Sequence, residues 1–167
     1  MPGHLCARAE TVSEVNRQLL DLLSRSGAAA ALLVDESGAL ISRQGRMPEG
    51  DPAETATLLT CNFLVTHELA KYLGDQEITV LFHEGEKKNF YLRRVGERGI
   101  LVVLFEDPGA LGRIQLFTDK TASALTPSLH GILLDALPAG MLPPGFLADA
   151  QQVVDTVLRA STSRVLH

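Results

Sequence analysis

Residues 78–105 read ITVLFHEGEKKNFYLRRVGERGILVVLF and contain three runs of strand-forming residues separated by two short turns. The runs cover residues 78–83, 89–93 and 100–105, and each turn contains glycine. β-Branched and aromatic residues in closely spaced runs, with glycine between them, are typical of consecutive antiparallel strands. The stretch therefore predicts a three-stranded meander.

Two further runs precede the meander, at residues 28–34 and 39–42, and a turn with the sequence DESG joins them. This pattern predicts a β-hairpin. The runs at 28–34 and 100–105 are apolar without alternation, which indicates strands buried on both faces. We therefore expect an α/β fold with a five-stranded sheet of order 2-1-5-4-3, in which these two runs lie near the centre and helices cover both faces.

Apolar residues at helical spacing predict three helices, over residues 10–24, 53–73 and about 119–134. Gly27 and Gly74 follow the first two helices and are natural stops, because glycine adopts the left-handed conformation of a helix C-terminus. The order of elements is therefore helix, hairpin, long helix, meander and helix.

The C-terminal region differs from the rest in composition. Residues 137–145 read LPAGMLPPG, and proline at this density excludes a regular helix or strand. The segment beyond it can form one apolar stripe of a short helix. We therefore expect one domain over residues 1–136, followed by a linker and an amphipathic tail over residues 137–167.

Composition excludes several classes of function. The net charge of −5 argues against nucleic-acid binding, which needs clustered lysine and arginine. Lys87-Lys88 and Arg93-Arg94 are short basic clusters that we interpret as solvated ends of hairpins. The two cysteines form neither a disulfide framework nor a CxxC site. No apolar run reaches 18 residues and the N-terminus lacks a secretory-signal pattern, so we expect a cytoplasmic protein that does not bind membranes.

Motifs of catalysis and of metal or cofactor binding are missing from the sequence. It contains no GxxxxGK[ST], GxGxxG, HExxH or GxSxG pattern. We interpret the adjacent His67 and Glu68 as a solvent-facing pair, His83 as a structural histidine and Cys61 as a packed small apolar residue. We therefore expect no cofactor, no metal ion and no active site of its own.

The long helix carries more apolar surface than one sheet can cover. At 100° per residue, one stripe is expected to face the sheet, and it contains Leu58, Cys61, Val65, Leu69, Tyr72 and Leu73. Leu59, Phe63 and Ala70 lie further round, so the apolar arc spans roughly 220°, against the ~100° or somewhat more of an ordinary surface helix. Another element of the same chain can cover the excess, or a protein partner can. A symmetric dimer is the commonest form of such a partner.

Four short stretches carry a resemblance to a known family. They are LVDESGALIS at residues 33–42, LAKYLG at 69–74, FHEG at 82–85 and LVVLF at 101–105, the last followed by Leu111-Gly112. In this order and spacing, over residues 10–130, the chain resembles the Roadblock family of the dynein light chain type, and most of all its bacterial MglB-like branch.

The resemblance implies a function as well as a fold. Roadblock proteins form homodimers in which the long helices pack together and the sheets join at an edge strand. MglB-like dimers bind MglA, a Ras-like small GTPase, and stimulate its GTP hydrolysis by repositioning the catalytic residues of the GTPase rather than by inserting an arginine finger. This implies a GTPase-activating protein in cell polarity or gliding motility, with recruitment to a cell pole.

The resemblance also implies two sets of site residues. The GTPase-binding set is Asn62, Leu64, His67, Glu68 and Lys71. The dimer-interface set is Leu59, Phe63, Thr66, Ala70, Thr79 and Leu81.

Two positions depart from the family pattern. Leu64 and Glu68 stand where alanine or glycine is expected, whereas Asn62 and Lys71 keep the pattern. Bulk and charge at these positions can alter the docking of a GTPase. The alternative function is therefore a non-catalytic Roadblock scaffold of the MglC-like kind, which assembles other polarity proteins.

Overall fold

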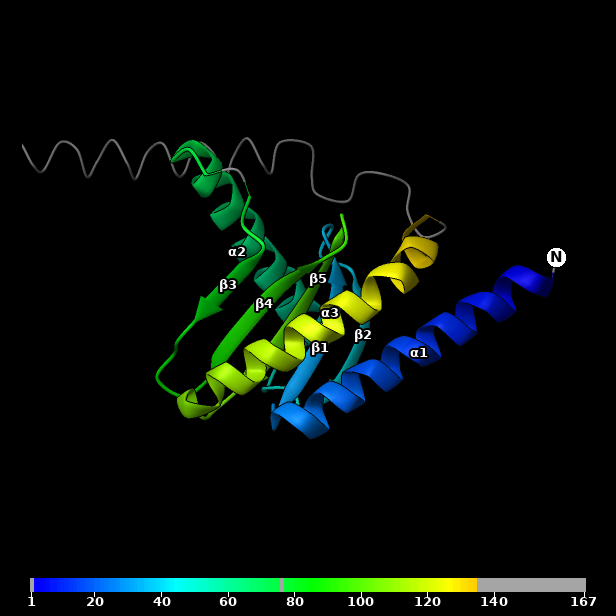
Figure 1. The fold of residues 1–167 in the computed structure, drawn as a ribbon, viewed down its shortest axis with the longest axis horizontal. Helices are drawn as coiled ribbons and strands as arrows, with labels where there is room; N and C mark the ends of the chain where they lie inside the picture. The colour runs from blue at the N-terminus through cyan, green and yellow to red at the C-terminus, as the bar shows by residue number, and fades with distance from the viewer. Residues whose placement is uncertain (1, 76, 135–167) are drawn as a thin grey trace, which may run out of the picture.

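The computed structural model describes residues 2–75 and 77–134, so the predicted linker and tail at residues 137–167 lie outside the described residues. Its elements are α1 (Pro2–Ser26), β1 (Ala30–Asp35), β2 (Leu40–Gly45), α2 (Pro52–Tyr72), β3 (Val80–His83), β4 (Asn89–Val95), β5 (Gly99–Phe105), the 3₁₀-helix η1 (Pro108–Ala110) and α3 (Leu111–Leu134) (Figure 1). None of the described helices is both long enough and apolar enough to cross a membrane.

The five strands form one antiparallel sheet in the order β2-β1-β5-β4-β3, which confirms the predicted topology. Every residue of β1 and β5 is buried, as their apolar sequences predict. The hairpin of β1 and β2 contains a bulge, because Leu33 pairs with Ser42 whereas Val34 pairs with Leu40. The extra residue, Ile41, packs against the same core as Leu33.

Two apolar cores lie on opposite faces of the sheet. On one face α1 and α3 lie side by side, and their residues Leu19 and Ile114 are fully buried against it (Figure 1). On the other face, α2 is the one helix among the described residues, and it packs through Leu59 and Phe63. The prediction of helices on both faces is therefore confirmed.

Two helices are longer than the sequence pattern predicts. α1 begins at Pro2 instead of residue 10, and proline suits the first turn of a helix. α3 begins at Leu111 instead of about residue 119. The 3₁₀-helix η1 runs directly into it, and the Asp107 side chain accepts a hydrogen bond from the N–H of Gly109 at the start of η1. Pro108 and Gly109, which follow the last strand, thus lie in the 3₁₀-helix that leads into α3.

The predicted orientation of the long helix is wrong. The residues of α2 that are buried are Ala56, Leu59, Thr60, Phe63, His67 and Ala70. Leu58 and Tyr72, which we expected to face the sheet, are 63% and 70% exposed. The buried side includes the polar residues Thr60 and His67, so it is not a continuous apolar stripe in the sequence. Thr60 is buried without penalty because its hydroxyl donates to the carbonyl of Ala56.

Candidate protein-interaction site

Helix α2 is positioned by clear signals at both of its ends. Asp51 caps the N-terminus by accepting a hydrogen bond from the N–H of Ala53, and Pro52 occupies the first turn. At the other end Gly74 adopts a positive φ of 95°, which glycine tolerates best. The C-terminal end of α2 projects beyond the sheet before the chain returns to form β3 (Figure 1). The helix therefore has a side that the sheet does not cover.

We define the outer stripe of α2 as Leu58, Cys61, Val65, Leu69 and Tyr72. These residues lie opposite the buried side of the helix at a spacing of three and four residues. Leu58 and Tyr72 are exposed, and the other three are half-buried. An apolar stripe along one exposed helix indicates a surface for protein–protein contact.

Cys61, in the middle of this stripe, does not provide a reactive group. Burial raises the pKa of its thiol above the ordinary value. A thiol of raised pKa stays protonated near neutral pH and is a poor nucleophile. The described residues also contain no group of three or more histidine, cysteine or acidic side chains placed to hold a metal ion.

The predicted GTPase-binding residues do not lie together. Leu64, Glu68 and Lys71 share one flank of α2, and the Lys71 ammonium lies 2.9 Å from the Glu68 carboxylate. Asn62 is exposed on nearly the opposite side of the helix, about 160° from Leu64.

His67 is not at the surface. Only 9% of it is exposed, and its Nδ1 atom accepts a hydrogen bond from the backbone N–H of Ile78. The interpretation of His67 as solvent-facing is therefore wrong.

Some of the predicted dimer-interface residues are buried in their own chain, and the others are accessible. Leu59, Phe63 and Ala70 are buried against the sheet of their own chain, so they do not reach the surface. This corrects the expectation for these three residues. Thr66 and Leu81 are half-buried and Thr79 is exposed, so these remain available to a partner.

The edge of the sheet beside α2 is formed by β3. Among the described strands, β3 pairs only with β4, so its outer side keeps unpaired backbone groups. Leu81 and Phe90 from these strands pack against the same core as α2. The His83 ring stacks on Phe90 with a centroid distance of 4.4 Å, and His83 is exposed. The outer stripe of α2 and the β3 edge thus lie on neighbouring elements.

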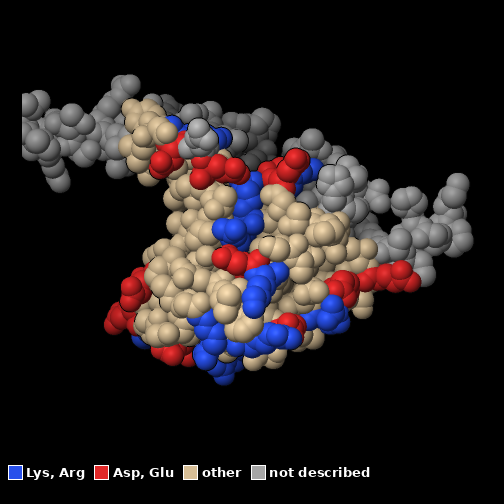
Figure 2. Space-filling view, viewed as in Figure 1, with Lys and Arg blue, Asp and Glu red and all other residues tan. Residues whose placement is uncertain are grey.

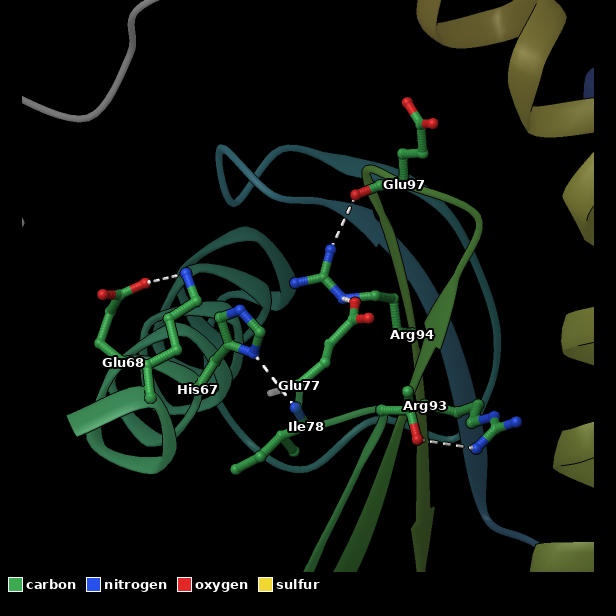
Figure 3. Close-up of polar contacts among 9 residues, drawn as sticks. His67, Glu68, Glu77, Ile78, Arg93, Arg94 and Glu97 are labelled. Atoms are coloured by element: carbon green, nitrogen blue, oxygen red, sulfur yellow. Dashed lines mark hydrogen bonds and ion pairs between the residues drawn. The ribbon is translucent and has the colours of Figure 1, made fainter. Parts of the chain in front are cut away.

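Arg94 on β4 is a residue whose structural role the sequence did not indicate. We interpreted it as a solvated hairpin end, but only 15% of its side chain is exposed. Its guanidinium lies 5.6 Å from the centroid of the Phe63 ring. It also donates a hydrogen bond to the carbonyl of Glu97 (Figure 3). Its Nε lies 3.6 Å from the Glu77 carboxylate, which is too long for a hydrogen bond. Arg94 therefore joins α2, β4 and the segment before β3.

The face formed by α1 and α3 has a different character. Lysine, arginine, aspartate and glutamate are interspersed on it, so no single sign of charge dominates (Figure 2). Where side-chain burial on this face is described, at residues 9–26 of α1 and 111–129 of α3, the exposed large apolar residues are Leu20 and Leu116. Single exposed leucines are ordinary on protein surfaces. The outer stripe of α2 is therefore the stronger candidate for a binding surface.

Known proteins resemble this chain in sequence and in structure. The Roadblock/LC7 domain family matches residues 14–105. The structure of Myxococcus xanthus MglB is 30% identical, with a TM-score of 0.68, over 77% of this chain and 95% of that chain. The gliding protein MglB from Thermus thermophilus is 31% identical, with a TM-score of 0.64, over 74% and 91% of the two chains. An MglB with a tetrameric arrangement is 32% identical, with a TM-score of 0.64, over 74% and 90%. No protein of curated function matches significantly.

Proposed function

Because this chain belongs to the Roadblock/LC7 family, we propose that it is a homodimeric regulator of a Ras-like small GTPase of the MglA type, and that it stimulates GTP hydrolysis by that GTPase. It would act in the cytoplasm, with recruitment to a cell pole, in cell polarity or gliding motility. The observation that carries the proposal is the outer stripe of α2, an exposed apolar surface on a chain about 30% identical to MglB proteins.

Self-association is the first part of the proposal. A second copy would cover the outer stripe of α2, and its β3 would lie beside the β3 edge of the first. Thr66, Thr79 and Leu81 keep their predicted place in this interface, whereas the exposed Leu58 and Tyr72 replace the buried Leu59, Phe63 and Ala70. The tetrameric arrangement of one MglB supports assembly through more than one copy of such a chain.

GTPase binding is the second part. Leu64, Glu68 and Lys71 form one flank of α2 next to the outer stripe, and a GTPase that docks there would also meet the second copy. Asn62 lies on the other flank, so in a symmetric dimer the Asn62 of one copy and the Lys71 of the other could contact the same GTPase. The chain would contribute a surface rather than a catalytic group, since the family mechanism repositions the residues of the GTPase.

Single-turnover hydrolysis of GTP by an MglA-type GTPase, with and without this protein, tests the proposal. We expect a saturable increase in the hydrolysis rate. Lys71→Glu should raise the half-saturating concentration, because it reverses a charge on the proposed flank. Lys87→Glu, an exposed lysine in the turn after β3, is the matched control and should behave like the wild type.

A scaffold of the MglC-like kind is the alternative function. The half-buried Leu64 and the ion-paired Glu68 favour it, because they occupy positions where the family carries small residues. Binding of the GTPase without any increase in its hydrolysis rate would support the scaffold and contradict the regulator.

A further inference from the structure

The edge strand β3 exposes backbone groups whose directions follow from its pairing with β4 (Figure 1). The register of this pairing places Thr79 opposite Arg94, and the Arg94 N–H donates to the Thr79 carbonyl. In an antiparallel strand the N–H and C=O of one residue point to the same side, and this side alternates from residue to residue. Leu81 therefore directs its backbone groups toward β4, as Thr79 does.

Val80 and Phe82 are consequently the residues of β3 whose N–H and C=O groups point outward from the sheet. Among the described strands, β4 is the one that pairs with β3, so no other strand of the described chain meets these groups. β3 also lacks the features that usually protect an exposed edge. Its residues, Val80–His83, include no proline, lysine or acidic residue, and they pair with β4 without a bulge. This edge is therefore open to one further strand.

The side chains of β3 divide between the two cores of the molecule. Val80 and Phe82 pack against the core beneath α1 and α3, and Leu81 packs against the core beneath α2. All three side chains are half-buried. A strand that lies against β3 would therefore cover apolar surface on both faces of the sheet at once.

A second copy of β3 matches both the backbone groups and the side chains. Residues directly opposite each other in an antiparallel pair have their side chains on the same face of the sheet. A two-fold axis at Leu81 places Val80 of each copy opposite Phe82 of the other. Both residues of such a pair have outward backbone groups, so each can donate its N–H to the C=O of the other. Every outward group of Val80 and Phe82 is then hydrogen-bonded.

Other positions of the two-fold axis fit the strand less well. An axis at Phe82 places Val80 opposite Glu84, which is exposed and lies beyond the end of β3. An axis at Val80 requires Ile78 to lie opposite Phe82, but Ile78 precedes the strand and packs against the core on the other face. An axis between two residues brings side chains of opposite faces together. The axis at Leu81 is therefore the one that joins strand residues alone.

We propose that β3 of a second copy extends the sheet across a two-fold axis at Leu81, with Val80 of each copy hydrogen-bonded to Phe82 of the other. The two Leu81 side chains meet on the axis and join the cores beneath α2. The pairs of Val80 and Phe82 join the cores beneath α1 and α3. This register rests on the proposed homodimer, whereas the GTP hydrolysis assay tests the regulator separately.

Disulfide cross-linking tests the register in a background in which Cys6 and Cys61 are replaced by serine. Leu81→Cys should convert most of the protein to a covalent dimer under mild oxidation. Opposite residues of a pair that is not hydrogen-bonded have Cα atoms about 4.5 Å apart, within the range of a disulfide. Phe82→Cys is the matched control and should not cross-link. Its two copies lie one residue to either side of the axis, with Cα atoms about 8 Å apart, too far for a disulfide.

The cross-linking results decide the register. Cross-linking of Phe82→Cys but not of Leu81→Cys would overturn it, and so would the absence of cross-linking from both variants while light scattering shows a dimer. A wild type that is monomeric at every concentration would overturn the register together with the homodimer, and would leave the edge to a strand of another protein.

Amide hydrogen exchange of the wild type decides the register without a substitution, should Leu81→Cys not fold. On dilution from dimer to monomer, the protection of the Val80 and Phe82 amides should fall by about tenfold or more, because these N–H groups bond across the junction. The Leu81 amide points to β4 and is the internal control, so its protection should stay high. Unchanged protection of Val80 and Phe82 on dissociation would overturn the register.

Discussion

Replacing Phe63 with alanine should remove a large part of the stability of the fold. Phe63 is fully buried between α2 and the sheet, and the Arg94 guanidinium lies over its ring. Truncation of a buried phenylalanine to alanine costs about 3–5 kcal/mol, and loss of the cation–π contact adds about 0.5–1 kcal/mol. Domains of this kind are stable by only about 5–15 kcal/mol, so Phe63→Ala should leave a marginal fold.

Leu58→Ala is the matched control on the same helix. Leu58 is 63% exposed, so the same kind of truncation should change the stability of the monomer by only about 0.5 kcal/mol. Urea denaturation followed by circular dichroism measures both variants. It should be carried out at low protein concentration, because self-association adds to apparent stability. The orientation of α2 would be refuted if Leu58→Ala lowered the midpoint as much as Phe63→Ala, or if Phe63→Ala unfolded at the wild-type midpoint.

Three further predictions follow from individual side chains. Asp35→Ala should lower the free energy of unfolding by about 1–3 kcal/mol in urea denaturation, because the buried Asp35 carboxylate accepts hydrogen bonds from the turn that follows it. Asp35→Asn keeps an acceptor and should lower the free energy of unfolding by less. Hydrogen bonds from Arg17 and Gln18 lower the pKa of Glu14 to about 2. Its contribution to stability should therefore be complete above the ordinary glutamate pKa and be lost as pH falls toward 2, and carboxyl NMR of Glu14 in acid checks this midpoint. Alanine substitution of any one exposed or half-exposed arginine should leave most GTPase stimulation intact at saturating protein, and a thousandfold loss with binding retained would instead reveal an arginine finger. The arginines to test are Arg43, Arg46, Arg93 and Arg98.

The sheet could be predicted from the sequence because its signals are local. The continuous apolar runs of β1 and β5 indicate burial on both faces, and glycine-containing turns of a few residues force neighbouring strands to pair. The bulge at Ile41 could not be predicted in the same way. The position of the bulge depends on which side chains of β2 face α1. There the side chains of Ser42 and Gln44 donate hydrogen bonds to the Asn16 side chain.

The orientation of α2 could not be predicted because periodicity identifies the faces of a helix without showing which one the sheet covers. Both faces of α2 are apolar, and its buried side includes Thr60 and His67. Each of these polar groups is satisfied by a hydrogen bond that the sequence does not reveal, one to the preceding helical turn and one to Ile78. The contacts of Arg94 could not be predicted for a similar reason, because its partners Phe63, Glu77 and Glu97 come from three different segments.

The outer stripe of α2 is the feature that carries the proposed function, and the mass of the protein in solution tests it most directly. Light scattering should give the wild type twice the 18.0 kDa of one chain. Leu58→Asp should give the mass of a single chain with an unchanged circular dichroism spectrum, because Leu58 is exposed in the folded monomer. Leu116→Asp, on an exposed leucine of the α1–α3 face, should remain a dimer. A wild-type mass of one chain, or a dimer that survives Leu58→Asp and dissociates in Leu116→Asp, would contradict self-association through α2.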